Sequence, residues 1–171
     1  MCALPFPDGS FDVVLCQQSL QYVPDKLAAL CDIKRVLVSG GRLILTVWST
    51  PHLHNAALAN AFRHHVNSEV ATRLLAPFAW GDAETIRKFV NDAAFRAIEM
   101  AVIESTTRMS SSADSVRSYI KGMASRYLSA REIEEARIAL EHEVSATLQT
   151  YRVGDEFVMT SKAHLVQARV A

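Results

Sequence analysis

The sequence contains few glycines, and these form none of the glycine-rich loops that bind nucleotides. Its six glycines lie at positions 9, 40, 41, 81, 122 and 154, so no GxGxxG or GxGxG pattern occurs. In doubly wound α/β sheets such a loop lets the backbone approach the bound nucleotide closely. The sequence therefore carries no complete nucleotide-binding fingerprint of its own.

Cysteine is also scarce. The three cysteines, Cys2, Cys16 and Cys31, are an odd number, without a CxxC pair or a partnering histidine spacing. This pattern argues against a structural zinc site and against a disulfide framework. Cys16 lies inside an apolar run, where cysteine usually behaves as a small hydrophobic residue.

Neither sign of charge is in excess. The 18 basic side chains balance the 18 acidic ones, and half of the residues are hydrophobic. This composition excludes a charge-driven disordered chain and gives no electrostatic reason to expect nucleic-acid binding. The sequence has no run of about eighteen apolar residues and no signal-peptide pattern at its start. We therefore expect a cytoplasmic protein of one domain, residues 1–171, with neither nucleic acid nor membrane as a partner.

The histidines do not show a metal-binding pattern. His64 and His65 are adjacent, so on a helix their side chains would point about 100° apart. No glutamate follows in HExxH spacing, and His52 and His54 add no further motif. We expect no metal site.

The first fifty residues do contain a clear strand–helix–strand pattern. The turn residues 7–10 precede an apolar run over 11–16, which is typical of a parallel strand covered on both faces. Asp25 is a candidate N-cap for a helix that we expect to stop at the glycine pair 40–41. A second strand follows over 42–48, joined to the first by a right-handed parallel crossover.

The remaining sequence alternates helices and strands without an internal repeat. Ser129 and Glu132 have the spacing of a capping box, which predicts the start of a long amphipathic helix. The expected elements after residue 50 are one or two helices within 51–80, a helix after Asp82, a strand over 95–105, a helix after 110–112, the long helix after Ser129, and a strand over 157–170.

Three segments resemble class I, S-adenosylmethionine-dependent methyltransferases. Residues 3–16, Ala-Leu-Pro-Phe-Pro-Asp-Gly-Ser-Phe-Asp-Val-Val-Leu-Cys, resemble the family's fourth-strand region. Residues 30–45, with the sequence Leu-Cys-Asp-Ile-Lys-Arg-Val-Leu-Val-Ser-Gly-Gly-Arg-Leu-Ile-Leu, are similar to its helix, Gly-Gly turn and fifth strand. Residues 164–169 are similar to the closing strand. Each motif is common alone, and their order and spacing make the resemblance specific. It points to small-molecule enzymes of the ubiquinone and menaquinone biosynthesis type.

The resemblance implies an α/β fold with part of a Rossmann-like methyltransferase sheet. The strands would be the family's fourth to seventh, in the spatial order fourth, fifth, seventh, sixth, with helices on both faces and a helical substrate-lid region. The family's Gly-rich loop and its ribose-binding acid come earlier than any residue of this sequence. We therefore expect the C-terminal half only, as a single incomplete methyltransferase domain.

The resemblance also implies part of an S-adenosylmethionine site. The family's adenine-contacting Asp aligns one residue before Met1, which places Met1, Cys2 and Leu4 on the adenine side. Cys16 and Gln17 match positions that line the methionine end of the cofactor, where ligands sit at the carboxyl ends of strands. The alternative for Cys16 and Gln17 is a buried strand end and a loop residue that satisfies backbone groups.

The acceptor side offers no catalytic base. Where relatives carry a Leu-His-His-like segment, residues 20–22 are Leu-Gln-Tyr. Gln21 can orient a substrate but cannot take a proton at neutral pH. We expect Trp48, Trp80 and Tyr119 to line an apolar acceptor pocket, with plain core packing as the alternative. Methyl transfer depends largely on holding acceptor and sulfonium in line, so the catalytic residues stay unknown.

Two functions stay open. By resemblance, the protein transfers a methyl group from S-adenosylmethionine to a small-molecule acceptor, although this chain alone would bind the cofactor poorly and be inactive. The alternative is a non-catalytic, truncated remnant that acts as a dimerisation or binding module. Because the strand over 11–16 lacks its family neighbour, we expect a homodimer or a pairing with a separate N-terminal half.

Overall fold

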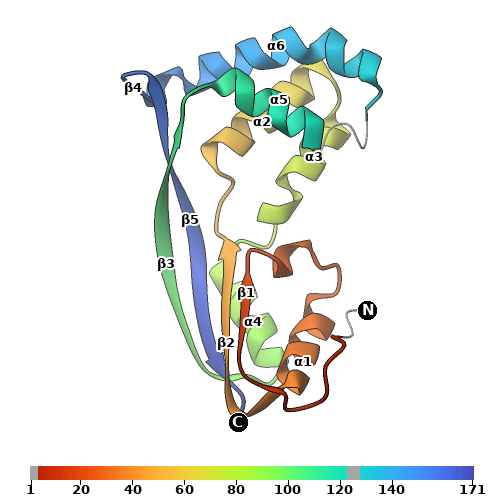
Figure 1. The fold of residues 1–171 in the computed structure, drawn as a ribbon, viewed down its shortest axis with the longest axis vertical. Helices are drawn as coiled ribbons and strands as arrows, with labels where there is room; N and C mark the ends of the chain where they lie inside the picture. Colours follow the sequence, from red (N-terminus) through yellow and green to blue (C-terminus); the bar gives the residue numbers. More distant parts are fainter. Residues whose placement is uncertain (1–3, 123–127) are drawn as a thin grey trace. The chain divides into compact units, whose positions relative to one another are not determined.

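Four long strands form the sheet of this α/β protein in the order β1-β2-β5-β3, and the short β4 pairs with β5 (Figure 1). β1 runs parallel to β2, and β5 runs antiparallel to β2. This spatial order agrees with the predicted one, and the identification of the strands as the family's fourth, fifth, seventh and sixth stays a prediction. The strands are β1 (Phe11–Gln17), β2 (Leu37–Trp48), β3 (Arg96–Met109), β4 (Arg152–Val153) and β5 (Glu156–Arg169).

The computed structural model describes residues 4–122 and 128–171. Within it the chain forms two compact units. Our expectation of one domain over 1–171 is not tested by this division and stays a prediction. Unit 1 comprises residues 1–50, 77–104 and 162–171, and unit 2 comprises residues 51–76 and 105–161.

In unit 1, helices α1 (Lys26–Val36) and α4 (Ala83–Asp92) contact each other and pack on one face of the sheet. Leu43, Leu45 and Val47 alternate along β2 and are fully buried in the same apolar cluster as both helices. We expected helices on both faces. Here both share one face because the chain crosses the sheet in the same direction twice, from β1 to β2 and then to β3 (Figure 1).

The glycine pair 40–41 does not end helix α1, as we had expected, but lies inside β2. The helix starts where the Asp25 side chain accepts the N–H of Ala28, and it ends at Val36. Phe11 of β1 pairs with Leu37, and the next pair along the ladder joins Val13 to Arg42. The extra residues of β2 form a bulge, in which Gly40 adopts a φ of +74°.

Unit 2 is largely helical and confirms the helices predicted within 51–80. Ser129 and Glu132 form the predicted capping box, and Leu140 and Val144 on the predicted stripe are fully buried. Its helices are α2 (Leu53–His65), α3 (Ser68–Leu75), α5 (Ser112–Gly122) and α6 (Ala130–Leu148), with the short turn η4 (Gln149–Tyr151) after α6. The short turn η2 (Ala76–Phe78) begins at the last residue of the first segment of unit 2 and continues into unit 1.

Candidate functional site

The carboxyl ends of β1 and β2 lie side by side in unit 1. Gln17 pairs with Thr46 in the parallel ladder, and the N–H of Gln18 donates to the Thr46 carbonyl at 3.0 Å. Cys16 is half-buried against the unit 1 core, while Gln17 is exposed. The structure thus places Cys16 and Gln17 at the edge of the sheet where a doubly wound fold binds its ligands.

The thiol of Cys16 is neutral at this strand end. Burial raises its pKa, and hydrogen bonds from the backbone N–H groups of Leu20 and Ser19 offset part of that effect. Because a raised pKa favours the protonated form, the group is a small neutral lining atom at pH 7. It can contact a ligand, but it is neither a nucleophile nor a base.

Two polar residues at this edge did not emerge from the sequence. The side-chain Oε1 of Gln18 and the Oγ1 of Thr46 are buried without a hydrogen-bond partner among the described residues. Gln18 also adopts a φ of +49°, a conformation that residues other than glycine rarely take. Buried polar groups are normally satisfied, and strained backbone clusters at functional sites. We therefore add Gln18 and Thr46 to the candidate site.

Gln21 lies on the 3₁₀ turn η1 (Leu20–Tyr22), directly after β1. It is buried, with 6% of its surface exposed, and its Oε1 accepts the N–H of Trp48 at 3.2 Å. Its Nε2 is buried without an acceptor in the described part of the chain. The structure therefore brings the Gln21 side chain to the backbone of Trp48, and the predicted role of both residues at an acceptor pocket stays a prediction.

Trp80 lies against the same strand end. Its ring packs edge-on against Phe89 at 5.6 Å, and the Lys26 ammonium lies 5.6 Å from its ring centroid. A Cβ on the following residue, Gly81, would lie 2.2 Å from the Ser49 carbonyl oxygen, so the two backbone segments are in close contact. Trp80 is thus close to the end of β2, with its Nε1 buried and without an acceptor among the described residues.

The remaining residues predicted for the site are Tyr119, Met1, Cys2 and Leu4. Tyr119 belongs to unit 2, where its ring packs against Phe62 at 5.4 Å, and its role at the acceptor pocket stays a prediction. Met1 and Cys2 lie outside the described residues. Leu4 is described, and its side chain packs against the unit 1 core.

An ion pair on α1 holds the segment around Leu4 in place. The Asp32 carboxylate accepts the Leu4 N–H at 2.5 Å and the Arg35 Nε–H at 2.7 Å. Arg35 also donates to the Leu4 carbonyl at 3.1 Å and to Asp8 at 2.7 Å. The hydrogen bond from Arg35, followed by that from Leu4, lowers the pKa of Asp32. The i,i+3 spacing of Asp32 and Arg35 was a signal that sequence reasoning could have used.

Both histidines at the end of α2 bind one carboxylate in unit 2. His64 Nδ1 lies 2.9 Å and His65 Nε2 lies 2.7 Å from the two oxygens of Glu143. Although the two histidines are adjacent in the sequence, both of their side chains therefore reach the same carboxylate. Even so, across residues 4–122 and 128–171, no three His, Cys, Asp or Glu side chains are arranged to hold a metal ion. None of the helices in these ranges is long and apolar enough to cross a membrane.

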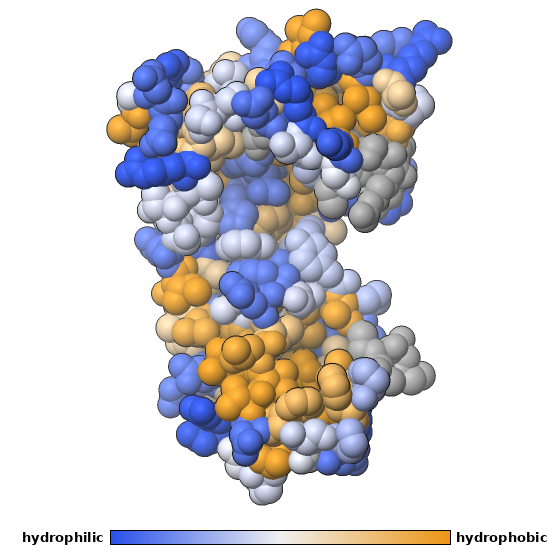
Figure 2. Space-filling view, viewed as in Figure 1, coloured by the Kyte–Doolittle hydropathy of each residue, from blue (hydrophilic) through white to orange (hydrophobic). Residues whose placement is uncertain are grey.

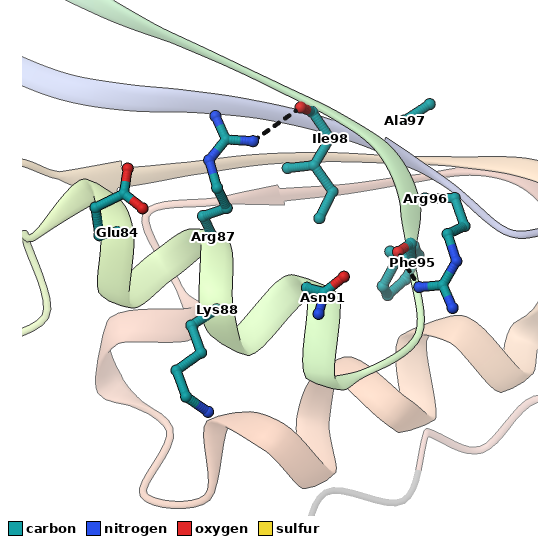
Figure 3. A pocket seen from close by; sticks show the side chains of 8 residues that line it. All are labelled: Glu84, Arg87, Lys88, Asn91, Phe95, Arg96, Ala97 and Ile98. Atoms are coloured by element: carbon teal, nitrogen blue, oxygen red, sulfur yellow. Dashed lines mark hydrogen bonds between the residues drawn. The ribbon is translucent and has the colours of Figure 1, made fainter.

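A separate hollow of about 420 Å³ lies between α4 and the start of β3 (Figure 3). Arg87 reaches across it and donates to the Ile98 carbonyl at 3.1 Å, whereas Lys88 pairs with Asp92. None of the residues predicted for cofactor or acceptor lines it. The lining residues are Glu84, Arg87, Lys88, Asn91, Phe95, Arg96, Ala97 and Ile98.

The open sheet of this chain, with its strand order β1-β2-β5-β3, is similar to the Rossmann-like sheet of class I methyltransferases. Two solved structures share the fold of this chain. A Bacillus halodurans C-125 protein assigned as a methyltransferase matches with a TM-score of 0.54 at 18% identity, over 97% of this chain and 67% of that one. The YcgJ protein of Bacillus subtilis matches with a TM-score of 0.53 at 20% identity, over 98% and 67%.

The sequence comparisons agree. Residues 1–45 match the methyltransferase domain family. The ubiquinone/menaquinone biosynthesis C-methyltransferases UbiE of Escherichia coli O1:K1 and of strain K12 are each 33% identical over 109 residues, covering 57% of this chain and 43% of theirs. The chain thus spans less than half the length of these curated relatives. These matches show a resemblance to class I, S-adenosylmethionine-dependent methyltransferases.

Proposed function

We propose that this chain forms the acceptor side and the methionine-end side of a site that transfers a methyl group from S-adenosylmethionine to a small apolar molecule. The observation that carries the proposal is the set of buried polar atoms without described partners at the carboxyl ends of β1 and β2, on Gln18, Gln21 and Thr46. Such atoms fit hydrogen bonds to a ligand better than plain core packing.

The residues at this edge fit the methionine end of the cofactor. The amide oxygen of Gln18 and the hydroxyl of Thr46 suit an ammonium and a carboxylate group, and the neutral Cys16 thiol can lie against the thioether carbons. When bound, the cofactor supplies an electrophilic methyl group on a sulfonium. The chain's own residues orient that end and exclude water, and Gln21 and Trp80 face the acceptor.

The rest of the cofactor site would come from an N-terminal half, in the same polypeptide or as a separate chain. In support, the sequence has no glycine-rich loop, and the chain spans 43% of the UbiE relatives. β1 also ends the sheet, so a further strand can pair with its outer side. Activity, acceptor and partners of the whole enzyme are part of this proposal.

A second candidate function is a non-catalytic dimerisation module. The observation that favours it is Leu15, which is 71% exposed on the outermost strand β1. A large apolar side chain on an unpaired strand suits association with another copy. In that case the carboxyl-end residues would not bind the cofactor under any condition.

A binding experiment on a chimeric protein distinguishes the two candidate functions. The N-terminal part of Escherichia coli UbiE that lies outside the match is joined ahead of residue 1, and the chimera is titrated with S-adenosylhomocysteine by calorimetry. We expect a dissociation constant of roughly micromolar order. Cys16→Trp should abolish binding, because the indole fills the ligand's volume, and Gln17→Ala should weaken it less. A folded chimera that binds nothing, or equal binding by all three proteins, contradicts the proposal.

A further inference from the structure

The hollow between α4 and the start of β3 is lined by cationic and apolar side chains (Figure 3). Its volume of about 420 Å³ is in the range of small-molecule sites. Three of its side chains carry a positive charge and one carries a negative charge, while the buried Phe95 and the half-buried Ile98 are apolar. None of the lining residues belongs to the candidate site at the carboxyl ends of β1 and β2.

Two arginines of the hollow keep most of their hydrogen-bonding capacity. The half-buried Arg87 donates to the Ile98 carbonyl at 3.1 Å. The exposed Arg96 donates to the carbonyl of the adjacent Phe95 at 3.0 Å. Among the residues that the structure describes, neither guanidinium forms an ion pair with a carboxylate. Because a guanidinium has several N–H donors, both arginines can bind an anion while they keep these contacts.

The side chains of α4 that line the hollow point in two directions. Figure 3 shows Arg87 and Asn91 on the side of α4 that faces Ile98, whereas Lys88 points away from it. The Lys88 ammonium is held by Asp92 at 2.5 Å, so it contributes positive charge rather than a contact. The amide of Asn91 can donate a further hydrogen bond to a ligand oxygen.

The backbone at the start of β3 is irregular where it borders the hollow. Side chains of a regular strand alternate between its two faces, yet the four consecutive residues 95–98 all line the hollow. Ala97, inside β3, has a φ of +49°, a left-handed conformation that interrupts this alternation. Ala94, just after α4, has a φ of +60°. Strained backbone of this kind clusters at functional sites, which supports a binding role for the hollow.

From these features we infer that the hollow binds a small molecule that carries one carboxylate on an apolar body. The planar guanidinium of Arg87 matches the two oxygens of a carboxylate, and Phe95 and Ile98 provide the lining for the apolar body. Inorganic phosphate would leave this apolar lining unused, and its second negative charge would be repelled by Glu84. The site is distinct from the proposed methyl-transfer site and does not depend on it.

Three probes test the inference on the ¹⁵N-labelled 171-residue chain at constant ionic strength. Benzoate carries the carboxylate and the ring, benzyl alcohol carries the ring without the charge, and inorganic phosphate carries the charge without the ring. We expect benzoate to give saturable shifts of the backbone amide signals of residues 84–98, and the other two probes to bind roughly tenfold more weakly. Absence of saturable benzoate shifts, or binding of either other probe as tight as that of benzoate, would overturn the inference.

Substitutions of Arg87 test its part in binding. Arg87→Gln removes the guanidinium and should weaken benzoate binding about tenfold or more. Arg87→Lys keeps the charge without the planar fork and should give an intermediate affinity. Arg63→Gln, at an exposed position on α2 in unit 2, is the matched control and should leave the affinity unchanged. Wild-type affinity in Arg87→Gln would overturn the inference, and if that variant does not fold, the three probes on the wild type decide.

Discussion

At the scale of single residues, the Asp32–Arg35 pair connects the start of the chain to α1. Asp32 accepts hydrogen bonds from Arg35 and from the Leu4 backbone, and both lower its pKa. Through this pair, the segment that the family resemblance places on the adenine side is held against a helix. The pair therefore acts on the position of Leu4 rather than on any ligand.

This geometry predicts a pH dependence. A carboxylate whose pKa is lowered by folding stabilises the native state above its unfolded pKa, about 3.9 for Asp, and this contribution is lost as the pH falls through the folded pKa. We expect Asp32→Asn to lower the melting temperature at pH 7 and to reduce its further fall between pH 5 and pH 3. Thermal unfolding by circular dichroism across that range measures both. Parallel curves for wild type and variant would show that Asp32 is not linked to folding.

The candidate site was predictable at some residues and not at others. Cys16, Gln21, Trp48 and Trp80 follow from motif position and residue type, and the structure brings Gln21 against Trp48. Thr46 could not be found, because its place opposite Gln17 depends on the strand register. That register in turn depends on a bulge, which no local pattern fixes.

At the scale of elements, caps and strands were predictable, whereas some boundaries were not. The capping box at Ser129 and the N-cap at Asp25 are local hydrogen-bonding patterns, and both occur as predicted. The glycine pair 40–41 does not end the helix, because a glycine in the left-handed conformation can form a β-bulge as well as a helix C-cap. Tertiary pairing between β1 and β2 decides between these two uses.

The capping box offers a test of local helix stability in unit 2. The Ser129 hydroxyl oxygen accepts the Glu132 N–H at 3.3 Å, and the Glu132 carboxylate accepts the Ser129 N–H at 2.8 Å. Ser129→Ala should lower the free energy of unfolding by about 1 kcal/mol. Ser118→Ala, at an exposed position within α5, is the matched control and should change it little. Urea unfolding followed at 222 nm measures both, and equal effects would contradict the assignment.

At the scale of the whole molecule, β1 forms one edge of the described sheet. It carries Asp12 as its one charged residue, and Leu15 is 71% exposed. Figure 2 shows apolar side chains gathered at the surface around β1 and β2. Natural edge strands are usually blunted by lysine, proline or bulges, and no lysine or proline occurs between Phe11 and Gln17.

We therefore propose that the isolated chain associates through β1 into a homodimer or a larger assembly. Leu15→Lys should shift it toward the monomer, because a charge on this strand opposes edge pairing. Ile138→Lys on α6, at a similarly exposed position of 68%, is the control and should leave association unchanged. Light scattering at tens of micromolar measures both. A monomeric wild type with amides protected from hydrogen exchange along β1 would contradict the proposal.

The most direct test of the account is a calorimetric titration of the 171-residue chain with S-adenosylhomocysteine. The sequence lacks the glycine-rich loop, the ribose acid and the adenine-contacting Asp of the family. Each hydrogen bond to a charged group contributes about 1.5–3 kcal/mol, and about 1.4 kcal/mol corresponds to a tenfold change in affinity. The account predicts binding weaker than roughly millimolar for this chain alone. A dissociation constant of micromolar order would contradict it, because the chain would then hold a complete cofactor site.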